Sequence, residues 1–233
     1  MDFRFSILSL SKIVVHHRNV MVLIALGFLT GPTICIDPGH PSEVGRGTQG
    51  KHVTEMQVAW DVSLALKTKL QSLGYEVVLT KKKLEEKVLN KRRAEIANEA
   101  HAALMVRLHC DASSDSGFAV YYPTQQGNID GFRGPEVSLL KTIAPLAQEF
   151  HAAMSSGLKG LLKDQGLKSD LKTAVGAQHG ALVGSIYSKV PVVLVEMVVL
   201  TNPKDEAFIV SKAGRAAMVG VLADGVLAAV PLR

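Results

Sequence analysis

Short apolar runs alternate with longer segments of helical periodicity along most of this chain. Because short buried runs separated by helices are typical of parallel strands, the pattern predicts an α/β fold with a mostly parallel, twisted sheet of about six strands and helices on both faces. With 233 residues, 47% of them hydrophobic, and no linker-like stretch in the middle, one domain is expected. The predicted strands lie at about 33–37, 75–80, 103–109, 117–122, 181–187 and 190–196.

The clearest helix begins at Thr54, an N-cap candidate. Apolar residues follow it at spacings of three and four, and Gly74 ends the pattern. A second helix is expected over about 87–100 and a last one over about 204–229.

Proline and glycine mark the boundaries in the middle of the chain. A third helix is expected from about 145 to 162, because Pro145 fits the first turn of a helix better than its interior. Residues 135–144 would then form a separate helical turn. Residues 123–135 contain several glycines and prolines and are expected to form a long loop that could rim a site.

Residues 1–31 differ from the rest of the chain, since three basic residues precede an apolar run of about ten residues at 20–29. This pattern predicts an export signal and is short for a membrane span. No small-x-small tripeptide precedes Gly31, so an uncleaved N-terminal anchor and a misassigned start codon stay open. The expected destination is the periplasm, the cell wall or the extracellular space, with 32–233 as the folded domain.

Charge and cysteine content narrow the possible partners. The formal net charge is +5, but the basic residues are scattered and lack interleaved aromatics, which favours an anionic polymer only weakly and predicts no nucleic-acid binding. The two cysteines, Cys35 and Cys110, are not spaced as a metal-binding pair. Buried free thiols are favoured over a disulfide.

Four polar residues stand at or after the ends of the apolar runs. His40, His109 and Glu196 come at or just past the carboxyl ends of predicted strands, and Glu55 follows the first strand by one loop. Because ligands collect beyond the carboxyl ends of strands in open parallel sheets, all four can converge on one edge. Two imidazoles and one carboxylate suit a catalytic zinc with one open position, and a further carboxylate suits the base beside it.

Each acid also has a purely structural interpretation. Glu55 could sit in the first helical turn simply because the helix dipole favours acids there. Glu196 follows five consecutive apolar residues, where an ionised carboxylate is costly without a partner or a task. The structural alternative for Glu196 is a salt bridge to Arg93 or Lys189.

Neighbouring residues leave further alternatives. Asp37 could accept the far ring N–H of a liganding histidine or brace the Pro38-Gly39 turn, and the turn role is slightly favoured. His109 and Cys110 cannot both be ligands, because neighbours on a strand point to opposite faces. Among the remaining histidines, His52 and His179 could touch substrate from loops, whereas His101 and His151 are expected at the surface or core edge, with no acid nearby.

Six sequence blocks follow one another in a specific order: Ile36-Asp37-Pro38-Gly39-His40, then Glu55, then Gly74 to Thr80, then Arg93 to Asn98, then Leu108-His109-Cys110-Asp111-Ala112, and finally Val193-Leu194-Val195-Glu196 with Thr201-Asn202-Pro203 and Asp205. Together they resemble the zinc-dependent N-acetylmuramoyl-L-alanine amidases of the amidase-3 family, which cleave bacterial peptidoglycan. The resemblance covers roughly 33–228.

The resemblance implies that His40, Glu55 and His109 hold Zn²⁺ and that Glu196 is the catalytic glutamate. It also implies an α/β sheet sandwiched by helices. The expected reaction is hydrolysis of the amide between N-acetylmuramic acid and L-alanine, with peptidoglycan as partner. A monomer is expected, with membrane contact only through an uncleaved N-terminal segment.

The chain departs from the family pattern in three places. Pro41-Ser42 stand where glycines commonly follow the first histidine, Arg107 replaces a small residue, and Met197-Val198-Val199 replace the usual Gly-Phe neighbourhood. The last two departures are expected to alter the walls of the cleft. Other zinc amidohydrolases or peptidases, a metal-free wall-binding module and a cysteine hydrolase using Cys110 remain as alternatives.

Overall fold

A six-stranded sheet organises the computed structural model of this chain, which describes residues 31–232. The strand order is β2-β1-β3-β8-β4-β7. The predicted export segment therefore lies outside the described residues, apart from Gly31. The strands are β1 (Thr33–Pro38), β2 (Glu76–Leu79), β3 (Leu104–Asp111), β4 (Phe118–Tyr122), β7 (Asp164–Ser169) and β8 (Val192–Val199).

Most neighbouring strands are parallel. β2, β1, β3 and β8 pair in parallel, β4 pairs antiparallel with β8, and β7 pairs in parallel with β4. The predicted α/β fold with a mostly parallel six-stranded sheet is thus confirmed. A separate antiparallel hairpin consists of β5 (Gly127–Ile129) and β6 (Phe132–Gly134).

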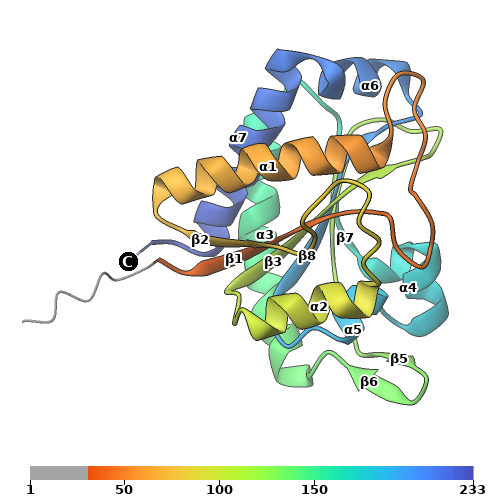
Figure 1. The fold of residues 1–233 in the computed structure, drawn as a ribbon, viewed down its shortest axis with the longest axis vertical. Coiled ribbons are helices and arrows are strands. Elements are labelled where there is room, and N and C mark those ends of the chain that lie inside the picture. Colours follow the sequence, from red (N-terminus) through yellow and green to blue (C-terminus); the bar gives the residue numbers. More distant parts are fainter. Residues whose placement is uncertain (1–30, 233) are drawn as a thin grey trace, which may run out of the picture.

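Helices cover both faces of the sheet (Figure 1). One face carries α1 (Glu55–Leu73), α3 (Val137–Leu158) and α7 (Lys212–Ala229), which pack on one another and on the strands. On the other side lie α2 (Asn90–Glu99), α4 (Ala174–His179) and α5 (Val183–Ile186). α6 (Pro203–Val210) follows β8, and a 3₁₀ turn at Asp170–Lys172 precedes α4. Among residues 31–232, no helix has the length and apolar character needed to cross a membrane.

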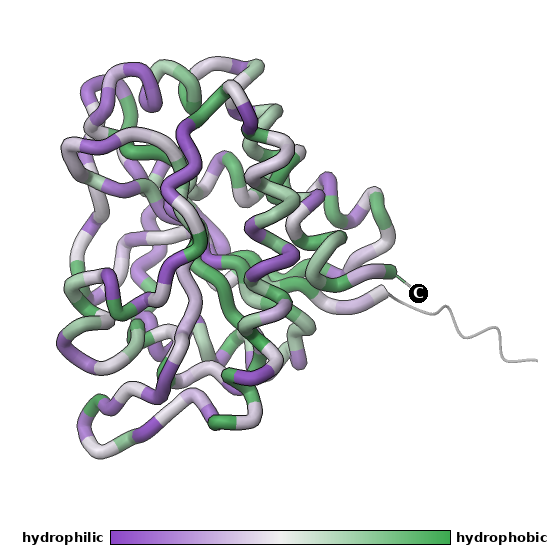
Figure 2. The backbone as a smooth tube through the Cα atoms, turned by 180° about the vertical axis from the view of Figure 1, so that it is seen from behind, coloured by the Kyte–Doolittle hydropathy of each residue, from purple (hydrophilic) through white to green (hydrophobic). Residues whose placement is uncertain are grey.

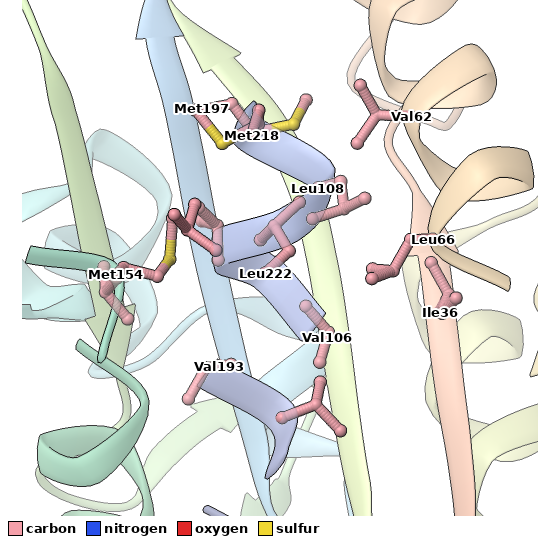
Figure 3. Close-up of a cluster of buried hydrophobic side chains, with 14 of the residues drawn as sticks. Ile36, Val62, Leu66, Val106, Leu108, Met154, Val193, Met197, Met218 and Leu222 are labelled. Carbon is pink, nitrogen blue, oxygen red and sulfur yellow. The ribbon is translucent and has the colours of Figure 1, made fainter. Parts of the chain in front are cut away.

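The main core lies between the sheet and the layer of α1, α3 and α7. Leu66 of α1, Met154 of α3 and Leu222 of α7 converge there on Val106 and Val193 of the central strands (Figure 3), and all five are fully buried. Figure 2 shows the same pattern along the backbone, with hydrophobic residues along the central strands and hydrophilic ones more frequent in the outer loops.

Helix α1 forms as the sequence predicts. The Thr54 hydroxyl accepts a hydrogen bond from the backbone N–H of Gln57 and caps the helix, and Gly74 ends it with a φ of 104° that favours glycine. The buried positions Val58, Val62, Leu66 and Leu70 recur every four residues. Burial of this stripe against the sheet fixes the start of the helix beside the carboxyl ends of β1 and β3.

One predicted strand is wrong. Residues 183–186 form the short helix α5, and the sixth strand is β7 at Asp164–Ser169. β7 is an edge strand whose residues are partly or fully exposed, so it carries no apolar run that would mark it. The apolar residues near 183 pack on the sheet instead, where Leu182 contacts the cluster that contains Leu194.

Two helix boundaries also differ from prediction. α3 runs unbroken through Pro145, which is exposed, so solvent can satisfy the Lys141 carbonyl that proline leaves unpaired. The last predicted helix is interrupted at Ser211, whose hydroxyl caps α7 by accepting from the Gly214 N–H. The predicted loop at 123–135 contains the β5–β6 hairpin.

Two leucines on α1 allow a direct test of this packing. Leu66 is fully buried and Leu64 is 41% exposed. Leu66→Ala should lower the free energy of unfolding by about 2–5 kcal/mol, because it removes buried methyl groups and leaves a cavity. Leu64→Ala should change it by about 0.5 kcal/mol or less. Urea denaturation measures both, and equal losses would contradict the placement of α1.

Candidate metal centre

Strand register places the predicted site residues at one end of the sheet. His109 of β3 and Glu196 of β8 are directly paired. Because residues in register on parallel strands point to the same face, their side chains lie side by side. His40 lies two residues after the end of β1, and β1 is the neighbour of β3 in the sheet. Glu55 enters from the first turn of α1.

Glu55 lies between the two histidines. Its Oε1 is 2.8 Å from His109 Nδ1 and 3.4 Å from His40 Nε2. One ligand atom from each of the three residues lies within 4.8 Å of the others, so the group could hold a metal ion. The structure therefore brings together the three residues that the sequence singled out as metal ligands.

The Glu55 carboxylate also fixes the surrounding backbone. Its Oε2 accepts a 2.6 Å hydrogen bond from Thr48 N–H, and its Oε1 accepts one of 3.2 Å from Cys110 N–H. Burial opposes ionisation of Glu55, but the hydrogen bonds with His109 and His40 lower its pKa below the usual range. Glu55 is thus held as a carboxylate, the form that binds a cation.

His40 is oriented by its own loop. Its Nδ1 lies 3.1 Å from the Gly45 carbonyl oxygen, which suits a ring that donates from Nδ1 and leaves Nε2 directed at Glu55. Its φ of 54° is uncommon for a residue with a side chain, and such conformations gather at functional sites. The Lys81 ammonium donates to the His40 carbonyl from the buried side. Burial lowers the His40 pKa, but the hydrogen bond with Glu55 outweighs it and the pKa is raised.

Two glycines make room for the imidazoles. A Cβ at Gly39 would lie 2.7 Å from His109 Cε1, and one at Gly47 would lie 2.6 Å from both Glu55 Oε2 and His40 Cδ2. Contacts this short exclude any side chain without movement of the ligands. Gly47 also has a φ of 83°, which favours glycine on its own account.

His109 and Cys110 face opposite sides of the sheet, as strand alternation requires. His109 faces Glu55, and burial lowers the pKa of its imidazole, which favours the neutral form that binds metals. Cys110 packs in the main core, and burial raises the pKa of its thiol well above the usual range. Cys35 is also a buried free thiol, so the structure supports neither a disulfide nor a cysteine nucleophile.

Glu196 is buried beside this group and makes no ion pair with any described residue. Its Oε2 atom has no hydrogen-bond partner within residues 31–232. Burial, together with the charges of Glu55 and Asp111, raises the pKa of Glu196 well above its usual value. The alternative of a salt bridge to Arg93 or Lys189 is therefore wrong.

Asp37 braces the turn before His40, which is the favoured of the two roles considered for it, and it does so through Arg93. Its fully buried carboxylate accepts hydrogen bonds from Thr80, Arg93 and Arg107 rather than from a liganding histidine. Burial opposes its ionisation, but the two guanidinium groups lower the Asp37 pKa. Arg93 also donates to the carbonyls of Pro38 and Pro41, so this network holds the turn that carries His40.

The site opens into a cleft of about 180 Å³. His40, His109 and Glu196 line it together with Arg107, and the segment of α4 and α5 forms its opposite wall with Thr173, Val175, Leu182 and Val183. Sequence reasoning missed this wall, since it assigned 181–187 to a strand. The helix start at Thr173, whose hydroxyl caps Gly176 N–H, was the available signal.

Several predicted cleft residues lie elsewhere. Met197 is fully buried in the core, so of the two expected wall changes only Arg107 reaches the cleft. The segment 123–135 does not line the cleft, and neither do His52 and His179. His151 has an acid partner that the sequence did not reveal, since its Nε2 lies 2.9 Å from Asp164 Oδ1.

The donor set fits zinc. Two imidazoles and one carboxylate match the three protein ligands of catalytic zinc sites. The carboxylate is held ionised, and one imidazole is held neutral. The unpartnered Glu196 oxygen beside them leaves an acceptor for a water molecule at the open position.

Comparisons with known proteins agree with this geometry. The chain is 30% identical over 185 residues to N-acetylmuramoyl-L-alanine amidase LytC of Bacillus subtilis (strain 168), a match that covers 76% of this chain and 31% of LytC. The chain thus spans about a third of the length of this curated relative.

Solved structures of amidases share the fold. Ami1 of Mycobacterium smegmatis has a TM-score of 0.71 at 19% identity, covering 86% of this chain and 97% of Ami1. AmiC2 of Nostoc punctiforme has a TM-score of 0.67 at 21% identity, covering 84% and 95%.

The family described as N-acetylmuramoyl-L-alanine amidase (Amidase_3) matches residues 34–228, which include all four residues of the site. With the sheet, the His-Glu-His group and this match in agreement, the chain belongs to the N-acetylmuramoyl-L-alanine amidase family, Amidase_3.

Proposed function

We propose that this chain is a zinc-dependent peptidoglycan amidase that hydrolyses the bond between N-acetylmuramic acid and L-alanine. The observation that carries the proposal is the group of His40, Glu55 and His109 with the buried, unpartnered Glu196 beside it. Membership of the amidase family supplies the substrate class. Zn²⁺ is the metal that this donor set and this family favour.

The side chains divide the work between binding and proton transfer. His40, Glu55 and His109 hold the metal, which when bound supplies a Lewis acid for the scissile carbonyl and lowers the pKa of water. Glu196 takes a proton from the attacking water and passes it to the nitrogen of the leaving L-alanine. A raised pKa suits this role, because the carboxyl must both accept and return a proton near neutral pH.

Substrate location suggests where the protein acts. Peptidoglycan lies outside the cytoplasm, so we propose that the segment 1–31 directs export or anchors the domain 32–233, which acts as a monomer. Another zinc amidohydrolase or peptidase acting on cell-wall peptides is the second candidate, because the same four residues would serve it.

Metal content tests the first half of the proposal. The purified full-length protein should contain about one zinc per chain, and His109→Ala should lose most of it, because only two ligands remain. His101→Ala is the matched control, since His101 is exposed at the end of α2 and outside the group. Elemental analysis of both variants gives the answer, and a metal-free wild type would overturn the proposal.

Product analysis tests the second half. Glu196→Gln should keep zinc but lose at least about 100-fold in turnover, because the amide cannot accept the proton from water. Glu206→Gln is the matched control, since that buried carboxylate accepts from His52 N–H and lies outside the cleft.

Mass spectrometry of digested cell wall then identifies the bond cleaved. Free stem peptides and intact glycan chains are expected. Cleavage within the stem peptide would favour the peptidase alternative, and wild-type turnover by Glu196→Gln would refute the role of Glu196.

A further inference from the structure

Arg107 lies on the same face of the sheet as the site residues, one step further from the strand ends. It precedes His109 by two positions on β3 and pairs in register with Asp37 and Leu194. The side chain is 4% exposed, and it lines the cleft together with His109 and Glu196. A buried guanidinium group therefore forms part of the cleft beside the proposed metal site.

Two of the three guanidinium nitrogens are already bonded. Nε donates to Asp37 Oδ2 at 2.9 Å, and Nη2 donates to Asn90 Oδ1. Nη1 has no acceptor among residues 31–232. These two bonds hold the planar group rigidly and leave one donor nitrogen for a ligand.

A glycine in the opposite wall leaves space for that nitrogen. A Cβ at Gly184 would lie 2.6 Å from Arg107 Nη1 and 2.9 Å from its Cζ. Gly184 belongs to α5, whose neighbours Leu182 and Val183 line the cleft. Any larger residue at 184 would displace the guanidinium, so the two positions are sterically matched.

Arg107 shares its ion-pair partner with a second arginine. The single Asp37 carboxylate is shared by Arg93 and Arg107, all three being buried. The Lys81 ammonium, also buried, donates to the His40 and Leu84 carbonyls rather than to an acid. Asp170 and Glu196 also act on the Arg107 charge, but neither forms an ion pair with it, so the free donor is open to an anionic group of a ligand.

The distance between Arg107 and His109 along β3 indicates which anionic group of a substrate Arg107 could bind. Two strand residues span about 6.6 Å, which separates Arg107 from His109 along β3. An extended peptide covers at most about 7 Å in two residues. A substrate that has its scissile carbonyl at the metal site and its stem along β3 in the cleft thus places its second stem residue near Arg107. In peptidoglycan that residue is a D-glutamate linked through its side-chain carboxyl, with a free α-carboxylate.

We propose, on the basis of the function proposed above, that Arg107 is a specificity-determining residue whose Nη1 binds the α-carboxylate of the second stem-peptide residue. The interaction discriminates between stems with a free carboxylate and stems in which this group is amidated. A carboxamide of the same shape has no negative charge, so it forms a weaker hydrogen bond with the guanidinium.

Two synthetic muropeptides that differ only at this group test the proposal, one with D-isoglutamate and one with D-isoglutamine as second residue. The wild type should have a kcat/KM at least about tenfold higher for the free acid, mainly through KM, because bonds to charged groups are stronger than neutral ones. Arg107→Met should bring the ratio of the two kcat/KM values to about 1. Lys168→Met is the control, because Lys168 also acts on the Glu196 charge but lies outside the cleft, so the ratio should not change.

A second variant keeps the protein's charge and covers the case in which Arg107→Met fails to fold. Gly184→Ala adds one methyl group against Nη1 and should lower the ratio at least threefold while thermal unfolding shows a folded protein. Equal kcat/KM values for the two muropeptides in the wild type would overturn the proposal, as would an unchanged ratio in a folded Arg107→Met or, where that variant does not fold, in Gly184→Ala. Absence of cleavage of either muropeptide by the zinc-loaded wild type would instead refute the proposed amidase function.

Discussion

The site depends on one buried carboxylate. Glu55 begins the helix α1 and lies on its buried face, and its oxygens accept from the loop after β1 and from β3 and lie next to both histidines. In the absence of such partners, burial would keep this carboxyl neutral. The same contacts that make Glu55 ionised also fix the distance between α1 and the end of the sheet. The packing of α1 on the sheet therefore also places Glu55 in the candidate ligand set.

A second buried acid supports the first. Asp37 touches neither histidine, yet it gathers Arg93 and Arg107, and Arg93 in turn binds the carbonyls on both sides of the turn that carries His40. The left-handed conformation of His40 costs free energy, which this network offsets. The two acids thus play distinct parts, with Glu55 facing the candidate metal position and Asp37 holding the backbone from which His40 projects.

Sequence reasoning predicted most of the features that depend on local pattern. The buried stripe of α1, its caps and the parallel strands were readable, because each depends on neighbours in the chain. The edge strand β7 and the wall formed by α4 and α5 were not, since a half-exposed strand lacks an apolar run and a short helix lacks periodicity. The candidate ligands could be identified because functional residues of parallel sheets gather at or beyond the carboxyl ends of the strands. The partners of Asp37 and the space at Gly184 could not be found, because they depend on contacts between distant segments.

The specificity role proposed for Arg107 depends on such contacts between distant segments. A long cation in place of a small residue would be costly on this buried face unless its charge were paired and its volume accommodated. Asp37 provides the first condition and Gly184 the second, and they come from different elements, β1 and α5. Neither Asp37 nor Gly184 is a candidate metal ligand. The proposed catalytic residues are therefore compatible with an arginine or with a small residue at position 107. In the proposed function, the ligand set thus determines the reaction, whereas Arg107, one step further along β3, determines which substrates are accepted.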